Sequence, residues 1–145
     1  MICLQSEDAF NPVVLTTTMK TLTQLAESVQ IEATKGARKT TFKPGDWRRE
    51  KQGWRITLKY QGRQYSLDFW QGHHADAPDA KNILSCILSD CSYTEYSVDE
   101  FQRELGYDNR KEAEAIYNHC SKQRREVERL LGDDFDTFME AENDV

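Results

Sequence analysis

The sequence has few of the features that mark a membrane, secreted or disulfide-stapled protein. No apolar run approaches the ~18 residues that a helix needs to span a bilayer. The N-terminal segment MICLQSEDAF contains no Lys or Arg and includes Glu7 and Asp8, so we expect no secretory signal. The four cysteines are scattered without a CxxC pair, which indicates reduced and mostly buried thiols. These absences predict a soluble cytoplasmic protein with no membrane partner.

Signatures of nucleotide cofactors and of common hydrolases are also missing. The chain contains no Walker loop, no dinucleotide-binding Gly-x-Gly-x-x-Gly and no Gly-x-Ser-x-Gly. We therefore expect no cofactor and no bound metal, and we interpret the protein as a binding module rather than an enzyme.

The length of 145 residues suits a single domain with one hydrophobic core. Residues 1–18 are weakly patterned, with Asn11-Pro12 and a run of threonines, so we expect a weakly ordered lead-in there. Residues 19–145 are predicted to form one α+β domain that ends in an acidic tail.

The clearest local signal is a period-two alternation on both sides of a glycine turn. Apolar and polar residues alternate over 54–60 and again over 65–70, on either side of Gln61-Gly62-Arg63. This pattern predicts an antiparallel hairpin over 54–70. A shorter alternation over 29–33 indicates a third strand.

Helices are predicted where apolar residues recur at helical spacing. They are expected over residues 19–29, 78–91, 97–105 and 110–131, followed by a half-buried turn at 135–139. Pro78 is expected in the first turn of its helix, and Phe101 and Leu105 are both expected to face inward. Gln123 and Arg124 interrupt the apolar stripe of the long helix, which suggests that the helix runs past the body there. The elements together predict an α+β fold: a small antiparallel sheet of about three strands packed against three to four helices, with helix 78–91 as the core.

Charge is distributed unevenly along the chain, whose net charge is −6. Residues 35–64 hold ten Lys or Arg against two acids, a local charge of +8, so the remainder carries −14. The segment after Gly132 contains six acids and no base. A protein divided in this way presents two surfaces of opposite potential, and each is a candidate for binding a partner.

The basic candidate surface comprises Trp47, Arg48, Arg49, Arg55, Lys59 and Arg63. Basic side chains on a strand can hold phosphates, and an exposed aromatic ring can stack on a base. Trp54 and Tyr60 share the apolar side of their strand and are expected in the core, which leaves Trp47 as the candidate stacking residue. Arg55, Lys59 and Arg63 are expected to face solvent. The competing interpretation is that this basic face is only solvated and binds no partner.

The acidic candidate surface comprises Asp133, Asp134, Asp136 and Glu140. Carboxylates spaced along a rigid helix can imitate a phosphate backbone and occupy a nucleic-acid channel on another protein. The competing interpretation is that these acids only keep the helices soluble, while neighbouring bases divide the surface into mixed pairs.

Two clusters contain groups that can bind metal or transfer protons. His73 and His74 lie in a loop with Asp76 and Asp79, and Asp90 lies in the helix that follows. Their spacing matches no known ligand pattern, so a helix-entry loop is the simpler interpretation. A second cluster, Cys86, Cys91, His119 and Cys120, lacks the paired spacing of a zinc site, and core packing is favoured for it.

Four segments occur in a distinctive order: WRITLKYQGRQYSLDFWQGHH, PDAKNILSCILSD, FQRELGYDNRKEAEAIYNHC and LLG. Over residues 47–132 this order resembles a family of small uncharacterised bacteriophage and prophage proteins. In that family a WRxTLxxxGR hairpin leads to a Gly-His loop, a Leu-x-Ser-Asp helix and a Gly-Tyr-Asp segment. Residues 1–46 match no part of the pattern. The resemblance implies a phage or mobile-element origin and a cytoplasmic setting, and it supplies no activity.

The favoured hypothesis is a phage-derived, non-enzymatic protein that inhibits or redirects a host protein or protein–nucleic-acid complex. An anti-CRISPR-like counter-defence role, by steric and electrostatic blocking, is one form of it. The alternatives are a nucleic-acid-binding accessory protein that uses the basic sheet face 48–63, and a small hydrolase or metal-dependent enzyme at the His73/His74 loop. The sequence leaves a homodimer open.

Overall fold

A computed structural model describes residues 20–37, 47–72 and 76–143 of the chain. The expected lead-in, residues 1–18, lies outside the described residues. The helices are α1 (Leu22–Ala26), α2 (Ala80–Ser92), α3 (Val98–Leu105), α4 (Arg110–Leu131) and α5 (Phe135–Asn143), with short 3-10 turns η2 (Trp47–Glu50), η3 (Tyr93–Glu95) and η4 (Gly132–Asp134). The strands are β1 (Gln30–Lys35), β2 (Lys51–Tyr60) and β3 (Arg63–Gly72). None of the described helices has the length and apolar character needed to cross a membrane.

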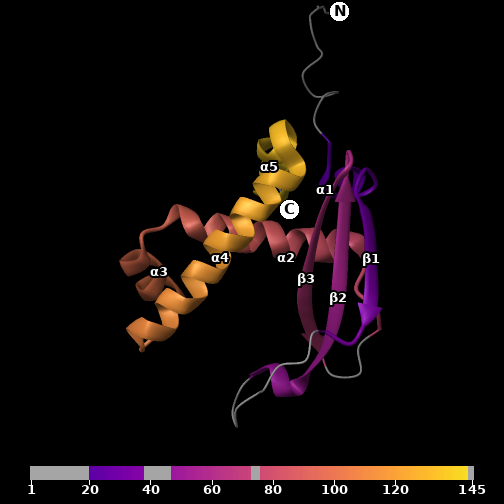
Figure 1. Ribbon diagram of the computed structural model, residues 1–145. Coiled ribbons are helices and arrows are strands. Elements are labelled where there is room, and N and C mark those ends of the chain that lie inside the picture. The colour runs from indigo at the N-terminus through magenta and orange to yellow at the C-terminus, as the bar shows by residue number, and fades with distance from the viewer. Residues whose placement is uncertain (1–19, 38–46, 73–75, 144–145) are drawn as a thin grey trace, which may run out of the picture.

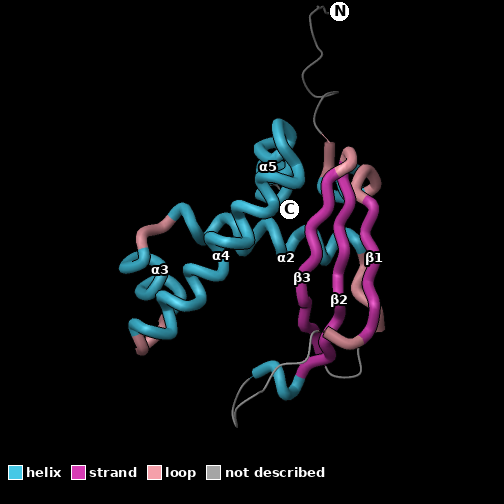
Figure 2. The backbone as a smooth tube through the Cα atoms, viewed as in Figure 1, coloured by secondary structure: helices cyan, strands magenta, loops and turns pink. Residues whose placement is uncertain are grey.

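The three strands form one antiparallel sheet in the order β1-β2-β3, which confirms the predicted α+β class (Figure 1). The hairpin turns at Gln61 and Gly62, whose φ angles of 48° and 81° match a two-residue turn that follows the twist of the strands. Residues 51–60 pair continuously with 63–72, so the hairpin is longer at its open end than predicted. The long helices lie on one side of this sheet, as the tube in Figure 2 shows.

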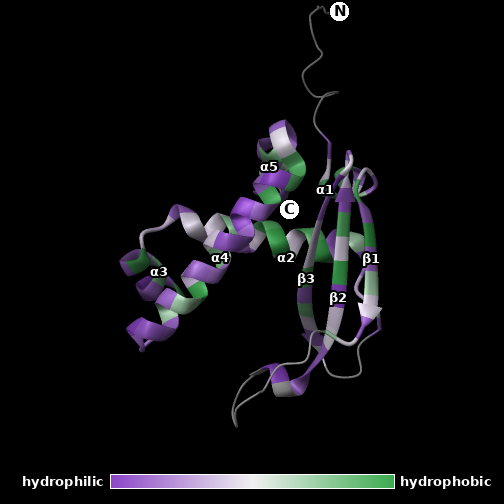
Figure 3. Ribbon diagram, in the orientation of Figure 1, coloured by the Kyte–Doolittle hydropathy of each residue, from purple (hydrophilic) through white to green (hydrophobic). Residues whose placement is uncertain are grey.

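Helix α2 packs at the centre of the molecule, where its apolar arc meets the inner side chains of β2. Ile83, Leu84, Ile87 and Leu88 are buried, and the apolar colouring of α2 in Figure 3 follows this arc. Its start differs from the prediction. The N-cap is Asp79, whose carboxylate accepts a hydrogen bond from the Asn82 backbone N–H at 2.8 Å, and Pro78 precedes the cap instead of opening the helix.

Most of the buried apolar residues form one cluster, and three lie outside it. Twenty belong to one cluster that joins α1, β2, α2, the end of α4 and α5. Phe101, Ala113 and Cys120 are also buried but lie outside that cluster. We call residues 93–120, which comprise η3, α3 and the first half of α4, the arm, and the rest of the described chain the body. The arm projects from one side of the body (Figure 1).

Helix α3 of the arm begins and ends as the sequence predicts. Ser97 and Glu100 form a capping box, and Gly106 terminates the helix with a φ of 73°, a conformation that glycine adopts without a steric penalty. Phe101 is fully buried. The expectation that Leu105 also faces inward is wrong, because its side chain is 38% exposed.

The acidic tail is a packed helix and not a half-buried turn. Phe135, Phe138 and Met139 are all buried, and α5 contacts α1 and α2. The Phe138 ring meets the Tyr60 ring edge-on at a centroid distance of 5.7 Å, which connects the tail to the end of the sheet.

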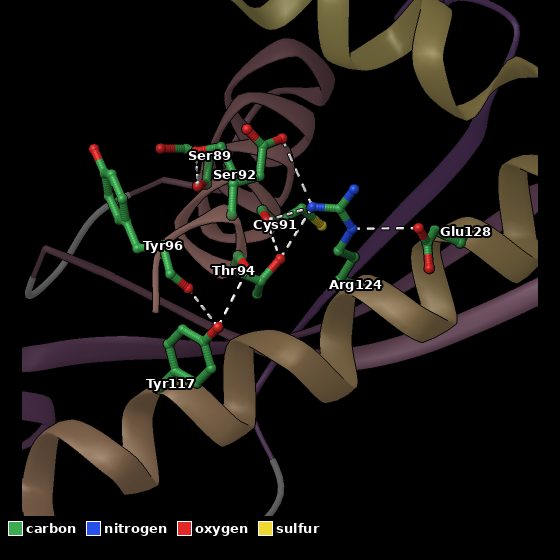
Figure 4. A network of polar contacts seen from close by, with 9 residues as sticks. Ser89, Cys91, Ser92, Thr94, Tyr96, Tyr117, Arg124 and Glu128 are labelled. Carbon is green, nitrogen blue, oxygen red and sulfur yellow. Dashed lines mark hydrogen bonds and ion pairs between the residues drawn. The ribbon is translucent and has the colours of Figure 1, made fainter. Parts of the chain in front are cut away.

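Gln123 and Arg124 hold α4 against the end of α2, which corrects the expectation that α4 runs past the body at these positions. Gln123 is 4% exposed, and its amide donates to a carboxylate oxygen of Asp90 at 3.1 Å. Arg124 donates to the Cys91 carbonyl at 3.3 Å and to the Thr94 hydroxyl at 3.0 Å, as Figure 4 shows. A guanidinium at the last carbonyls of α2 also satisfies the negative end of that helix.

Candidate functional site

The outer face of the sheet carries nearly balanced charge and is not the strongly basic surface that the sequence predicts. Strand register places three bases and two acids on this face: Lys51, Arg55, Lys59, Glu32 and Asp68. Arg55 forms an ion pair with Asp68 on the neighbouring strand at 3.0 Å. The described side chains of this face therefore leave an excess of a single positive charge.

Arg63 lies on the opposite side of the sheet from Lys59 and supports the fold. Its Nε donates to the Leu130 carbonyl in the last turn of α4 at 2.8 Å. This contact satisfies a carbonyl at the helix end, where a positive charge is favourable. The structure thus differs from the expectation that Arg63 faces solvent, since it is half-buried against α4.

The aromatic residue on the outer face is Trp70, which the sequence analysis did not single out. It lies across the strand from Gly53, where a Cβ would come within 2.5 Å of the indole ring. The glycine therefore makes room for the ring, and an alternating strand with a glycine opposite a tryptophan is the signal that could have found it. The side chains of Trp47 and Arg49 lie outside the described residues, and Arg48 is half-buried.

Three of the four acidic candidates remain exposed on one side of η4 and α5. Asp133, Asp136 and Glu140 are spaced three and four residues apart, which places them on one helical face. None of the three has an ion-pair partner among the residues that the structure describes. We call these three residues the acidic stripe.

The fourth candidate, Asp134, is committed to the fold. Its carboxylate accepts a hydrogen bond from the Tyr60 hydroxyl at 2.5 Å. Burial, followed by this carboxylate, raises the pKa of Tyr60 to about 12, so the phenol stays protonated and donates at neutral pH. Asp134 and Arg63 thus both fasten the hairpin end to the junction of α4 and α5.

Cations on the arm and α4 are largely paired with carboxylates. Arg110 bonds Asp99 and Glu114, Arg129 bonds Glu126 at 2.7 Å, and Arg124 bonds Glu128 at 3.2 Å. Such surface pairs contribute little stability each, but they remove both charges from what a partner meets. These paired cations and carboxylates differ from the three carboxylates of the acidic stripe, which have no ion-pair partner among the described residues.

The histidine loop cannot be assembled into a site from the described residues. His73 and His74 lie outside them. Asp79 caps α2, and Asp90 lies where α2 meets α4, so the acids of this cluster are separated along α2. No group of three His, Cys, Asp or Glu suited to a metal ion occurs in the described part of the chain.

The cysteines differ in exposure, and Cys3 lies outside the described residues. Cys91 and Cys120 are buried, as expected, whereas Cys86 is exposed. Burial raises the pKa of Cys91 to about 12 and that of Cys120 to about 11, so both are thiols at neutral pH and are weak nucleophiles.

No protein-family model matches this chain, and no curated protein or solved structure matches it significantly either. The resemblance to phage proteins over residues 47–132 stays a prediction.

Proposed function

We propose that the protein is a non-enzymatic binding protein of phage origin that blocks or redirects a host protein complex in the cytoplasm. The acidic stripe, Asp133, Asp136 and Glu140, is the contact surface. Its target is a basic groove of a nucleic-acid-handling complex, such as a CRISPR effector, which the carboxylates occupy in place of phosphates.

The observation that carries the proposal is the unequal pairing of charge. The described bases of the sheet and the arm mostly have acidic or carbonyl partners, as the Arg55–Asp68 and Arg63–Leu130 contacts illustrate. The acidic stripe has none among the described residues, and buried Phe135, Phe138 and Met139 hold it on a packed helix. Fixed, unpaired carboxylates lose little entropy when they meet a basic partner, which favours binding.

The nearly balanced outer sheet face gives less support to direct nucleic-acid binding. A polyanion gains affinity from a surface of large net positive charge, and the described part of this face has three bases against two acids. The basic residues at 38–46 lie outside the described residues, so the experiment must also be able to detect direct binding of nucleic acid.

A charge-reversal pair tests the proposal. Three proteins are used to capture partners from nuclease-treated host lysate: the wild type, the stripe variant Asp136→Lys/Glu140→Lys and the control variant Glu50→Lys/Asp76→Lys. The captured complex is then purified, and its affinity for each of the three proteins is measured. Both variants replace two exposed acids and change the net charge equally, but Glu50 and Asp76 lie at the end of the sheet away from α5 (Figure 1).

The stripe variant is expected to bind the purified complex about tenfold more weakly or worse, the control is expected to bind like the wild type, and added target nucleic acid is expected to compete. Equal binding by both variants would remove the acidic stripe from the interface. A gel shift of free DNA or RNA with a steep salt dependence, with no captured protein complex, would instead support the nucleic-acid-binding alternative.

A further inference from the structure

The arm carries a depression of about 390 Å³ where α3 ends and α4 begins. It is lined by Asp99, Gln102, Arg103, Gly106, Tyr107 and Asp108. A Cβ added at Gly106 would meet nothing within 4 Å, so the floor of the turn is open. The lining residues belong to α3 and the turn before α4, and Figure 1 shows that this junction lies at the other end of α4 from α5, so the depression is separate from the acidic stripe.

We propose that this depression binds the guanidinium group of an arginine side chain from a protein partner. The site offers an aromatic ring, a carboxylate and a helix C-terminus within one small hollow. Each of these groups attracts a cation, and a planar guanidinium can use all three, since it stacks on rings and donates in its own plane.

Tyr107 supplies the ring. Phe101 stacks on it at a centroid distance of 5.8 Å and an interplanar angle of 24°, so the orientation of the ring is fixed by the buried centre of the arm. Tyr107 itself is half-buried and lines the depression, which leaves part of the ring in contact with solvent. A ring held in this way is a preformed platform for a cation.

Asp108 supplies the unpaired charge. Of the two aspartates in the lining, Asp99 forms an ion pair with Arg110, and that pair holds the pKa of Asp99 below its usual range. Asp108 is exposed and has no ion-pair partner among the described residues. Arg103, the cation of the lining, forms an ion pair with Glu104 at 3.6 Å.

The end of α3 supplies the third attraction. The Gly106 and Tyr107 backbone N–H groups bond the carbonyls of Arg103 and Gln102. The carbonyls of the final residues of a helix carry the negative end of its dipole, and no backbone bond to Glu104 or Leu105 occurs in the described turn. A cation in the depression is therefore favoured by the backbone as well as by Asp108.

The site is tested by nuclear magnetic resonance of the full chain, with Nα-acetyl-arginine amide as the probe and Nα-acetyl-citrulline amide as its uncharged isostere. Arginine is expected to produce saturable shifts of the backbone amides of residues 106–108 at millimolar concentration, and citrulline is expected to produce none. Asp108→Asn is expected to weaken the arginine response roughly two- to fivefold. Asp76→Asn, an equal charge change at an exposed residue outside both proposed sites, is expected to leave it unchanged.

Equal shifts with citrulline, or shifts that are as large at α5 as at residues 106–108, would overturn the proposal. So would an unchanged response in Asp108→Asn. None of these results requires a host complex, and the Asp108→Asn comparison involves no residue of the acidic stripe, so the arm site and the proposed function can fail independently.

Discussion

In the body, strands and helices separated by more than a hundred residues in sequence, from Leu22 to Ala141, bury their side chains in one cluster, whereas the arm is a local structure. Phe101 is surrounded by the rings of Tyr93, Tyr107 and Tyr117, at centroid distances of 6.0, 5.8 and 5.4 Å. The body instead buries twenty residues, most of them on α1, β2, α2, α4 and α5. We therefore expect the body to unfold as one cooperative unit and the arm to open on its own at lower cost.

Loss of one phenylalanine from each region tests this difference most strongly. Phe138→Ala is expected to lower the global free energy of unfolding by about 3–5 kcal/mol, because removal of the fully buried ring leaves a cavity that solvent does not fill. Phe101→Ala removes an equally buried ring but is expected to open α3 locally, with a much smaller global effect. Urea unfolding gives the global values, and native-state hydrogen exchange shows which amides lose protection.

Equal global losses in the two variants, with protection lost uniformly along the chain, would show that the arm and the body are one cooperative unit. The two regions would then differ in composition and not in stability.

The contacts of Arg124 sharpen the comparison, because Arg124 of the body donates a hydrogen bond to Thr94 of the arm. Arg124→Met keeps an apolar side chain but removes the guanidinium, which lies over the Phe135 ring and bonds Cys91, Thr94 and Glu128. We expect a loss of about 1–3 kcal/mol, since carbonyls at the end of α2 lose their charged donor. The exchange of α3 amides is expected to accelerate more than that of α2 amides.

Arg125→Met is the matched control for this change. Arg125 is exposed and has no ion-pair partner among the described residues, so its replacement is expected to alter stability by less than about 0.5 kcal/mol. A similar loss in both variants would mean that the guanidinium contacts of Arg124 do not hold the arm.

Local patterns in the sequence predicted the elements of both regions well. Alternation on either side of Gln61-Gly62 identified the hairpin, and the helical spacing of apolar residues located α3 and gave the bounds of α4. These signals succeed because turns, caps and periodicity depend on residues that are neighbours in the chain. The fold class followed from them.

The errors fall where a polar side chain finds a partner far away in sequence. Gln123 and Arg124 interrupt an apolar stripe, but they bond partners that lie thirty or more residues earlier, in and just after α2. Arg63 and Asp134 were grouped with surface charges, although each bonds across the hairpin end at a separation of about seventy residues. Polarity alone cannot show whether a charge faces solvent, so the acidic surface loses Asp134 and the basic surface loses Arg63.

The smallest expected effect concerns Asp90, where α2 of the body meets α4. Burial raises the pKa of Asp90, while the Gln123 amide and the nearby His119 act in the opposite direction. Because the folded-state pKa lies above the unfolded value, this carboxyl favours the fold most when it is protonated. Its contribution is fully present below the unfolded pKa, near 3.8, and is lost as the pH rises through the raised pKa.

Asp90→Asn removes that pH dependence and keeps an oxygen that can accept from Gln123. We expect the variant to be more stable than the wild type at pH 7, by at most about 1 kcal/mol, and the difference to vanish below pH of about 4. Urea midpoints measured from pH 3 to pH 8 test both statements, with Asp136→Asn as an exposed control that is expected to show no such trend. A variant less stable than the wild type at pH 7 would mean that the charged carboxylate holds α4 to α2 through Gln123 and His119. The junction would then depend on electrostatic interactions, whereas the core of the body depends on apolar packing.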